Sequence, residues 1–167
     1  FHESVSQSGG GNLFLNGTSA LDTSDPARIT STNTTTFTLD GYHSTYDAIN
    51  QSSQTYLAYC FAEIQGYSKF GSYTGNDSLD GTFVYTGFKP AWILFKQTEN
   101  TGGWTMKDNK RSPENPADER LLADDDPAES TGADIDFLSN GFKCRSRSNA
   151  VNEIQNYIYM AFAEHPF

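Results

Sequence analysis

Two stretches of the chain share one alternating pattern of apolar side chains. Residues 55–63 read TYLAYCFAE, and residues 156–164 read NYIYMAFAE. Successive side chains of a strand point to opposite faces, which places Leu57, Tyr59 and Phe61 together on one face of the first stretch. Because the other face is apolar as well, the pattern predicts that each stretch is a central strand covered on both sides.

The other apolar runs are short and lie between turn residues. Residues 81–85, 92–95 and 104–107 are predicted strands, and Pro90 suits a strand that is entered from a rigid turn. Residues 117–122 could form one helical turn and no more, so we expect no amphipathic helix.

The strongest turn signals are Asn140-Gly141 and Asp40-Gly41. Such signals recur about every ten residues, between about ten short strands. This spacing predicts an all-β fold made of antiparallel β-sandwich modules, of a jelly-roll-like kind.

The similarity between the two parts of the chain extends beyond one strand. Residues 37–42 (FTLDGY) match residues 137–142 (FLSNGF), at the same offset of near 100 residues as the first pair. Residues 81–107 have no counterpart in the first copy. We therefore predict one and a half copies of a module: an incomplete rear half at residues 1–67 and a complete copy at residues 68–167.

A rear half alone would leave strand edges unpaired. Three sources could complete it: residues upstream, a strand from a neighbouring subunit, or a core shared by the two copies. The chain starts with Phe1 rather than Met, and we interpret it as a fragment or a processed product. Residues 66–76, which we interpret as the linker, contain three aromatic residues and are expected to pack.

Composition narrows the function classes. The 167 residues carry a formal net charge of -10, which disfavours nucleic acid as a partner. No apolar run approaches the roughly 18 residues of a membrane-spanning helix, so membrane insertion is not expected. Cys60 and Cys144 lie in no metal-binding motif; we expect free thiols, although a bridge between them stays open.

Five strings in the second half of the chain carry a family likeness. They are YSKFGSYTGN, GTFVYTGFKPAW, DNKR, IDFLSNGFK and YIYMAFAE, at residues 67–76, 81–92, 108–111, 135–143 and 157–164. Over nearly all of residues 55–167 the chain resembles an uncharacterised β-domain family that recurs, often in tandem, in structural and tail-fibre-like proteins of marine bacteriophages. The resemblance implies a virion location and a structural or adhesive role, and it implies no catalytic residue or cofactor.

The densest acidic region is 114–136, with Asp124, Asp125 and Asp126 in a row. Carboxylates are ligands for calcium, but the spacing of an EF-hand is absent. Pro116 and Pro127 mark a surface loop, so a solvated acidic loop is the preferred interpretation and no metal site is predicted.

Glycoside hydrolysis would need two carboxyl groups that work together. The candidates are Glu63, Glu164, Asp108 and Asp136. The two glutamates recur with the repeat, so a repeated structural role is the simpler account. The histidines are isolated and lie in no catalytic motif: His2, His43 and His165.

Aromatic residues remain as candidates for recognition. Trp92 and Trp104 lie in apolar strands, which favours packing in the core over stacking on sugars. Four tyrosines in polar, loop-like sequence are better candidates for a receptor or subunit contact: Tyr42, Tyr46, Tyr67 and Tyr73.

These features together predict a non-enzymatic bacteriophage virion protein, either a tail fibre or another adhesive, receptor-binding component. We expect no cofactor, a homo-oligomer, other virion subunits as partners, and host-surface polysaccharide or another receptor as the ligand. Capsid decoration is the alternative within this class. A polysaccharide-degrading tail enzyme is the alternative from another class.

Overall fold

The computed structural model describes residues 11–23, 29–33, 35–39 and 50–165, and these residues form strands and loops without a helix. The strands are β1 (Ile29–Thr32), β2 (Phe37–Leu39), β3 (Ser68–Thr74), β4 (Phe83–Tyr85), β5 (Pro90–Gln97), β6 (Thr105–Asp108), β7 (Ala117–Leu122), β8 (Ser130–Leu138), β9 (Gly141–Cys144) and β10 (Asn156–Ala163). The expected all-β fold is therefore confirmed. No helix of the described residues is long and apolar enough to cross a membrane.

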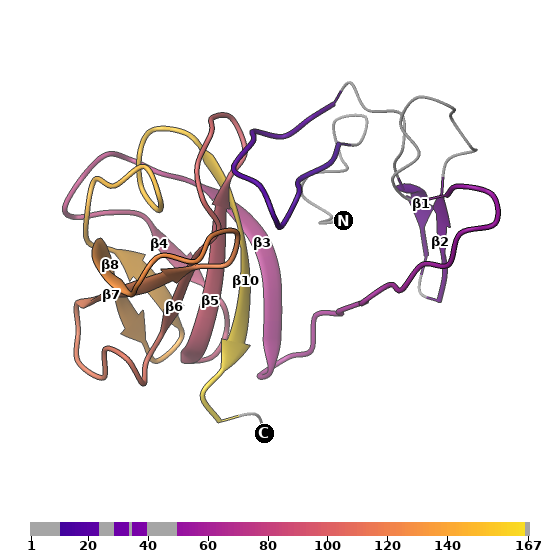
Figure 1. Ribbon diagram of the computed structural model, residues 1–167. Helices are drawn as coiled ribbons and strands as arrows, with labels where there is room; N and C mark the ends of the chain where they lie inside the picture. Colours follow the sequence, from indigo (N-terminus) through magenta and orange to yellow (C-terminus); the bar gives the residue numbers. More distant parts are fainter. Residues whose placement is uncertain (1–10, 24–28, 34, 40–49, 166–167) are drawn as a thin grey trace.

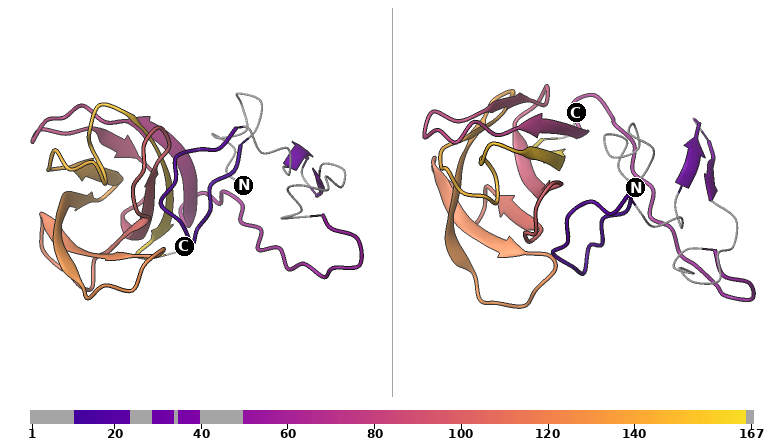
Figure 2. Two further views of the ribbon diagram at one scale, coloured as in Figure 1. Left: turned by 45° about the horizontal axis from the view of Figure 1, so that its top comes forward. Right: turned by 90° about the horizontal axis from the view of Figure 1, so that it is seen from above.

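Eight strands form one antiparallel sheet in the order β3-β10-β5-β6-β7-β8-β9-β4. This sheet curls until it is nearly closed, so that its two halves face each other as the layers of a sandwich (Figure 1, Figure 2). Phe142 of β9 lies between the layers, with its ring centroid 5.2 Å from Phe95 of β5 and 5.4 Å from Tyr159 of β10. The core is thus built by facing strands, as the sandwich prediction requires.

β10 is a central strand of this sheet. It pairs with β3 on one side and with β5 on the other. Its side chains alternate as predicted, with Tyr157, Tyr159 and Ala161 buried in the core. On the opposite face Met160 and Phe162 are only partly buried.

Two predictions for the shorter segments are wrong. Residues 117–122 form β7, because Ala117 is fully buried and the strand completes the sheet between β6 and β8. Residues 68–74, taken as linker, form β3, because Tyr73 enters the core. The turn between β8 and β9 falls where Asn140-Gly141 predicts it, although its residues are Ser139 and Asn140 and Gly141 begins β9, whereas Asp40-Gly41 lies outside the described residues.

β1 and β2 form a separate antiparallel hairpin. In Figure 1 and Figure 2 this hairpin stands apart from the eight-stranded sheet, and residues 50–66 run between them as an extended trace. Residues 11–23 lie against the sheet instead, where the Leu21 amide donates to the Thr98 carbonyl over 2.8 Å.

Residues 55–63 differ from the predicted central strand. They belong to no strand of the described chain, and most of their large side chains are exposed, with Leu57 at 77% and Tyr59 at 79%. A central strand needs a neighbour on each side, and β10 already occupies the place between β3 and β5. The pattern is therefore present in this segment without the neighbours that would make it a strand.

Candidate binding face

The outer face of β4, β9 and β8 presents two large aromatic side chains to solvent. Phe83 is 46% exposed and Tyr85 is 65% exposed, while Val84 between them is buried in the core. This alternation follows from the strand geometry, because neighbouring side chains leave the sheet on opposite sides. The two rings therefore lie on one face of an edge strand.

The strand register places charged residues and a glycine beside the two rings. Phe83 is paired with Lys143 of β9, which is paired in turn with Asp136 of β8. Tyr85 is paired with Gly141 in the same way. These residues form one continuous surface, which we call the β4 face: Phe83, Tyr85, Lys143, Gly141 and Asp136.

Gly141 allows the backbones of β4 and β9 to approach closely at this face. A Cβ atom on Gly141 would lie 2.1 Å from the carbonyl oxygen of Val84 and 3.1 Å from Cε2 of Phe83. Any larger residue would push the Phe83 ring outward or break the pairing of the two strands. The glycine thus keeps the aromatic surface flat.

Two further charged side chains, Asp80 and Arg145, border the β4 face and pair with its charged residues. Asp80 accepts a hydrogen bond from Lys143, and this bond holds the pKa of Asp80 below its ordinary value. Arg145 lies between two carboxylates, with Nη1 3.9 Å from Asp80 and Nε 3.2 Å from Asp136. The border therefore offers fixed donors and acceptors of both signs at the rim of an apolar surface.

Such an arrangement suits binding to a flat, polar ligand. Exposed aromatic rings bury their apolar faces against a partner, and aromatic and arginine side chains are enriched in recognition surfaces. Because Asp80 and Asp136 are both held in ion pairs with cationic side chains, they are suited to accept hydrogen bonds from hydroxyl groups.

The residues predicted for recognition lie elsewhere. Tyr73 is buried in the core, where its ring stacks on Tyr157 at a centroid distance of 5.1 Å, so the predicted contact role is wrong. Tyr67 is half-buried and packs edge-on against Phe162 at 5.8 Å. Tyr42 and Tyr46 lie outside the described residues.

The two tryptophans are half-buried and lie outside the central core. Trp92 packs on the outer face of β5, with its ring 5.9 Å from Phe162 of β10. Trp104 donates a hydrogen bond from Nε1 to the carbonyl oxygen of Phe14 over 2.8 Å, which ties residues 11–23 to the sheet. Both lie on the surface of the sheet, so the expected packing in the core is wrong.

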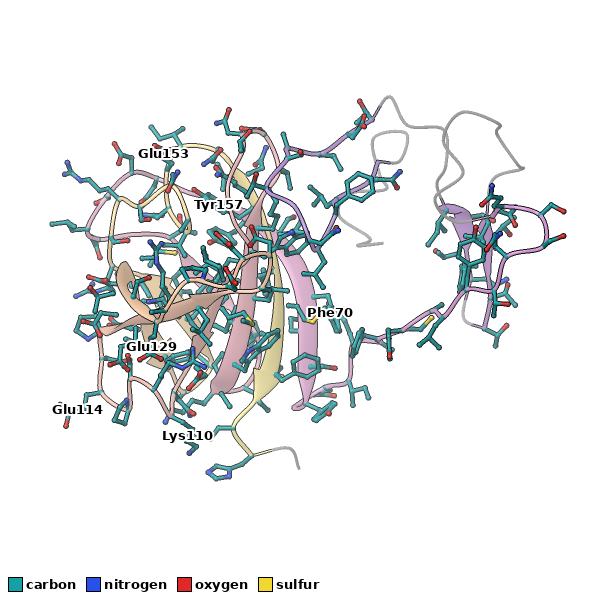
Figure 3. The ribbon with its side chains drawn as sticks, viewed as in Figure 1. Phe70, Lys110, Glu114, Glu129, Glu153 and Tyr157 are labelled. Carbon is teal, nitrogen blue, oxygen red and sulfur yellow. The ribbon has the colours of Figure 1, made fainter. Side chains whose placement is uncertain are left out.

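The acidic region 114–136 is only partly a loop. Residues 117–122 belong to β7 and residues 130–136 to β8, and residues 123–129 connect the two strands. Figure 3 shows Glu114 and Glu129 at separate places on the surface, and Glu129 forms an ion pair with Arg111, with Oε2 3.0 Å from Nε. Within the described residues no group of three acidic, histidine or cysteine side chains is placed to hold a metal ion.

The carboxylates considered for hydrolysis are engaged in ion pairs. Glu164 lies 2.8 Å from Nζ of Lys89, whose hydrogen bond lowers the pKa of the glutamate. Glu63 lies 2.8 Å from Nζ of Lys69, and Asp108 lies 3.0 Å from Nη2 of Arg111. None of these pairs brings two of the candidate carboxylates together.

The cysteines are both free, as expected: Cys60 is exposed and Cys144 is buried. Burial raises the pKa of Cys144 to about 12. His165 is exposed, while His2 and His43 lie outside the described residues.

Several buried polar residues of the core could not be recognised from the sequence. Lys107 is fully buried, and its Nζ donates to the carbonyl oxygens of Ala117, Asp118 and Gly132 over 3.2, 2.7 and 2.7 Å. Burial lowers the pKa of Lys107 to about 8. Phe83 and Tyr85 were also missed, since an apolar run such as Phe83-Val84-Tyr85 does not reveal which face is buried.

The fold and this surface define a class: a two-layer, all-β protein with an exposed aromatic face on an edge strand. The chain belongs to the family described as a domain of unknown function, DUF7483, and the model of this family matches residues 1–166. Searches of curated proteins and of solved structures found no match to the chain.

Proposed function

We propose that the chain is a non-enzymatic structural protein of a bacteriophage particle, a tail-fibre-like component that binds a host-surface polysaccharide or another receptor. The observation that carries the adhesive role is the pair Phe83 and Tyr85, exposed side by side on one face of a rigid sheet. Large aromatic rings that stay exposed in a folded protein mark an interaction surface.

The resemblance to marine bacteriophage proteins supports the virion location, through strings such as residues 67–76 and 157–164. Residues 81–107, which contain Phe83 and Tyr85, have no counterpart in the first copy, so each chain carries one β4 face and repeated, weak contacts would come from several chains. Several copies of a shallow site gain affinity through multivalency, without a deep pocket in any of them. A homo-oligomeric fibre would supply those copies, with other virion subunits as its remaining partners.

Binding to a panel of bacterial surface polysaccharides tests the adhesive role. We expect the full chain to retain at least one polysaccharide, and Tyr85→Ala to weaken this binding about tenfold, the loss of roughly one stacked ring. The matched control is Tyr56→Ala, because Tyr56 is also an exposed tyrosine, at 47%, but lies off the β4 face. Equal binding by both variants would contradict the role of this face.

Two further readouts separate the alternatives. Micrographs of labelled particles should show the protein at the tail, since a capsid decoration protein would follow the symmetry of the shell. Incubation with the bound polysaccharide should release no reducing ends, which a polysaccharide-degrading enzyme would produce.

A further inference from the structure

Residues 55–63 and β10 correspond residue by residue, with an offset of 101 that aligns Tyr56 with Tyr157 and Glu63 with Glu164. The inner face of β10, with Tyr157 and Ala161, corresponds to Tyr56 and Cys60. The outer face, with Met160 and Phe162, corresponds to Tyr59 and Phe61. Sequence alone thus assigns each exposed side chain of the segment to a place on a central strand.

In each segment the first tyrosine hydroxyl accepts a backbone amide from just upstream. The backbone amide of Glu153 donates to the hydroxyl of Tyr157 over 3.0 Å, a contact that fixes the entry into β10. The backbone amide of Gln51 donates to the hydroxyl of Tyr56 over 2.9 Å. The donor lies four residues before Tyr157 and five before Tyr56, so a local contact of the same kind but different spacing precedes each segment, although only β10 has strands beside it.

β10 also shows what neighbours this pattern requires. Met160 is paired with Leu94 of β5 and with Phe70 of β3, and Ala161 is paired with Ile93 of β5. Phe70 lies on the edge strand β3, at the side of the sheet nearest to the extended trace (Figure 3). In residues 55–63 the equivalent side chains Tyr59 and Cys60 are exposed and have no strand beside them in the described chain.

We infer that residues 55–63 are the last strand of another module and insert between two strands that have the patterns of β3 and β5. The partner is a front half of this fold without a β10 of its own, which supplies the equivalents of Ser68–Thr74 and Pro90–Gln97, because β10 fills this place in the described chain. Insertion would cover both faces of the segment and pair both of its edges. This inference does not depend on polysaccharide binding.

β3 itself does not serve as the partner of the segment. The carboxylate of Glu63 accepts the amide of Phe70 over 3.2 Å, and the amide of Ser68 donates to the carbonyl of Ile64 over 2.9 Å. These contacts occupy the start of the β3 edge with the chain that leads into it. Phe61 then packs on Phe70 and Phe162, with ring centroids 6.2 and 6.1 Å away.

A cross-linking experiment tests the partner and the register together. The probe is a polypeptide with the sequence of residues 64–112, which contains the patterns of β3 and β5 and no cysteine. In the inferred register, Cys60 of the full chain lies opposite residue 93 of the probe, within the Cα separation that a disulfide spans. A probe carrying Ile93→Cys is therefore mixed with the full chain and oxidised with glutathione disulfide.

We expect the Ile93→Cys probe to form a disulfide with Cys60 at least about tenfold faster than a Leu94→Cys probe, since adjacent strand residues face opposite sides. Tyr59→Asp in the full chain should abolish the cross-link, because it places a charge between two apolar strands. Tyr85→Asp, a matched exposed tyrosine on β4, should leave the cross-link unchanged. Both chain variants lie outside the core, so the sheet stays folded.

Equal rates for the two probes would overturn the inference, because they would indicate contact without register. Cys60–Cys60 dimers of the full chain as the dominant product would also overturn it, since a second copy of the same segment would then be the partner. Failure of the polysaccharide assay would leave the cross-link unaffected, so the two proposals fail separately.

Discussion

β10 and residues 55–63 have almost the same pattern and opposite environments. Tyr157 is fully buried between β3 and β5, whereas Tyr56 is 47% exposed on an extended segment. Both tyrosine hydroxyls accept a backbone amide from a few residues upstream. A local hydrogen bond to the tyrosine hydroxyl therefore forms in both regions, whereas the strand forms only where neighbouring strands are present.

The largest difference between the two regions should appear in thiol reactivity. Cys60 is exposed and should react with a thiol reagent at the rate of an unfolded peptide. Cys144 is buried, with a pKa of about 12, and should react only when the sheet opens, about a thousandfold or more slowly. Stopped-flow labelling with Ellman's reagent measures both phases.

The Cys60→Ser variant assigns the phases in this labelling experiment. It should remove the fast phase and leave the slow one. A single fast phase that accounts for both thiols would show that the sheet is open at Cys144. This result would contradict the difference in burial between the two regions.

Removal of the equivalent tyrosine side chains should have unequal effects on stability. Tyr157→Ala should lower the free energy of unfolding by about 3–5 kcal/mol, because it removes a buried ring that stacks on Tyr73. Tyr56→Ala should change it by less than about 0.5 kcal/mol, as for exposed positions. Urea denaturation followed by tryptophan fluorescence measures the free energy of unfolding of both variants. Equal losses in the two variants would contradict the difference in burial between the two tyrosines.

Alkaline pH should weaken the sheet through its buried acids. Burial raises the pKa of Tyr157 and Tyr159 from 10.0 to about 12, and that of Cys144 from 9.0 to about 12. Between these values the unfolded chain loses protons that the folded chain keeps, so stability should fall as the pH rises from about 9 to 12.

Lys107 has the opposite pH dependence. Its pKa is lowered by burial from 10.5 to about 8, so its contribution should raise stability between these values. Urea midpoints measured from pH 7 to 11 should therefore show their steepest fall above pH 10, with a smaller fall in Tyr157→Phe. A midpoint that rises throughout this range would contradict the assignment of these groups to the core.

Much of the fold could be predicted because strand periodicity and turn residues are local signals. The pattern of residues 156–164 predicted β10, and Asn140-Gly141 predicted the turn between β8 and β9. Residues 68–74 were misread because their strand character comes from pairing with the distant β10, and residues 117–122 because theirs comes from pairing with β6 and β8. In the same way, the sequence did not show that residues 55–63 have no neighbouring strand in the described chain.

The candidate site could be predicted far less well. Tyr73 and Tyr85 both lie in aromatic, polar stretches, yet one is in the core and the other is 65% exposed. The side of the sheet that a residue faces depends on register, and the sequence shows the alternation without showing which face is inside. Buried Lys107 was missed because its partners are backbone carbonyls of β7 and β8, which any sequence could supply.

Hydrogen–deuterium exchange of the full chain tests whether β10 is paired while residues 55–63 are not, because it measures strand pairing in both regions of one molecule. We expect the amides of residues 157–163 to exchange only through opening of the sheet. The amides of residues 55–61 should exchange within about tenfold of the rate for an unstructured peptide. Equal, strong protection in the two segments of the isolated chain would contradict this expectation.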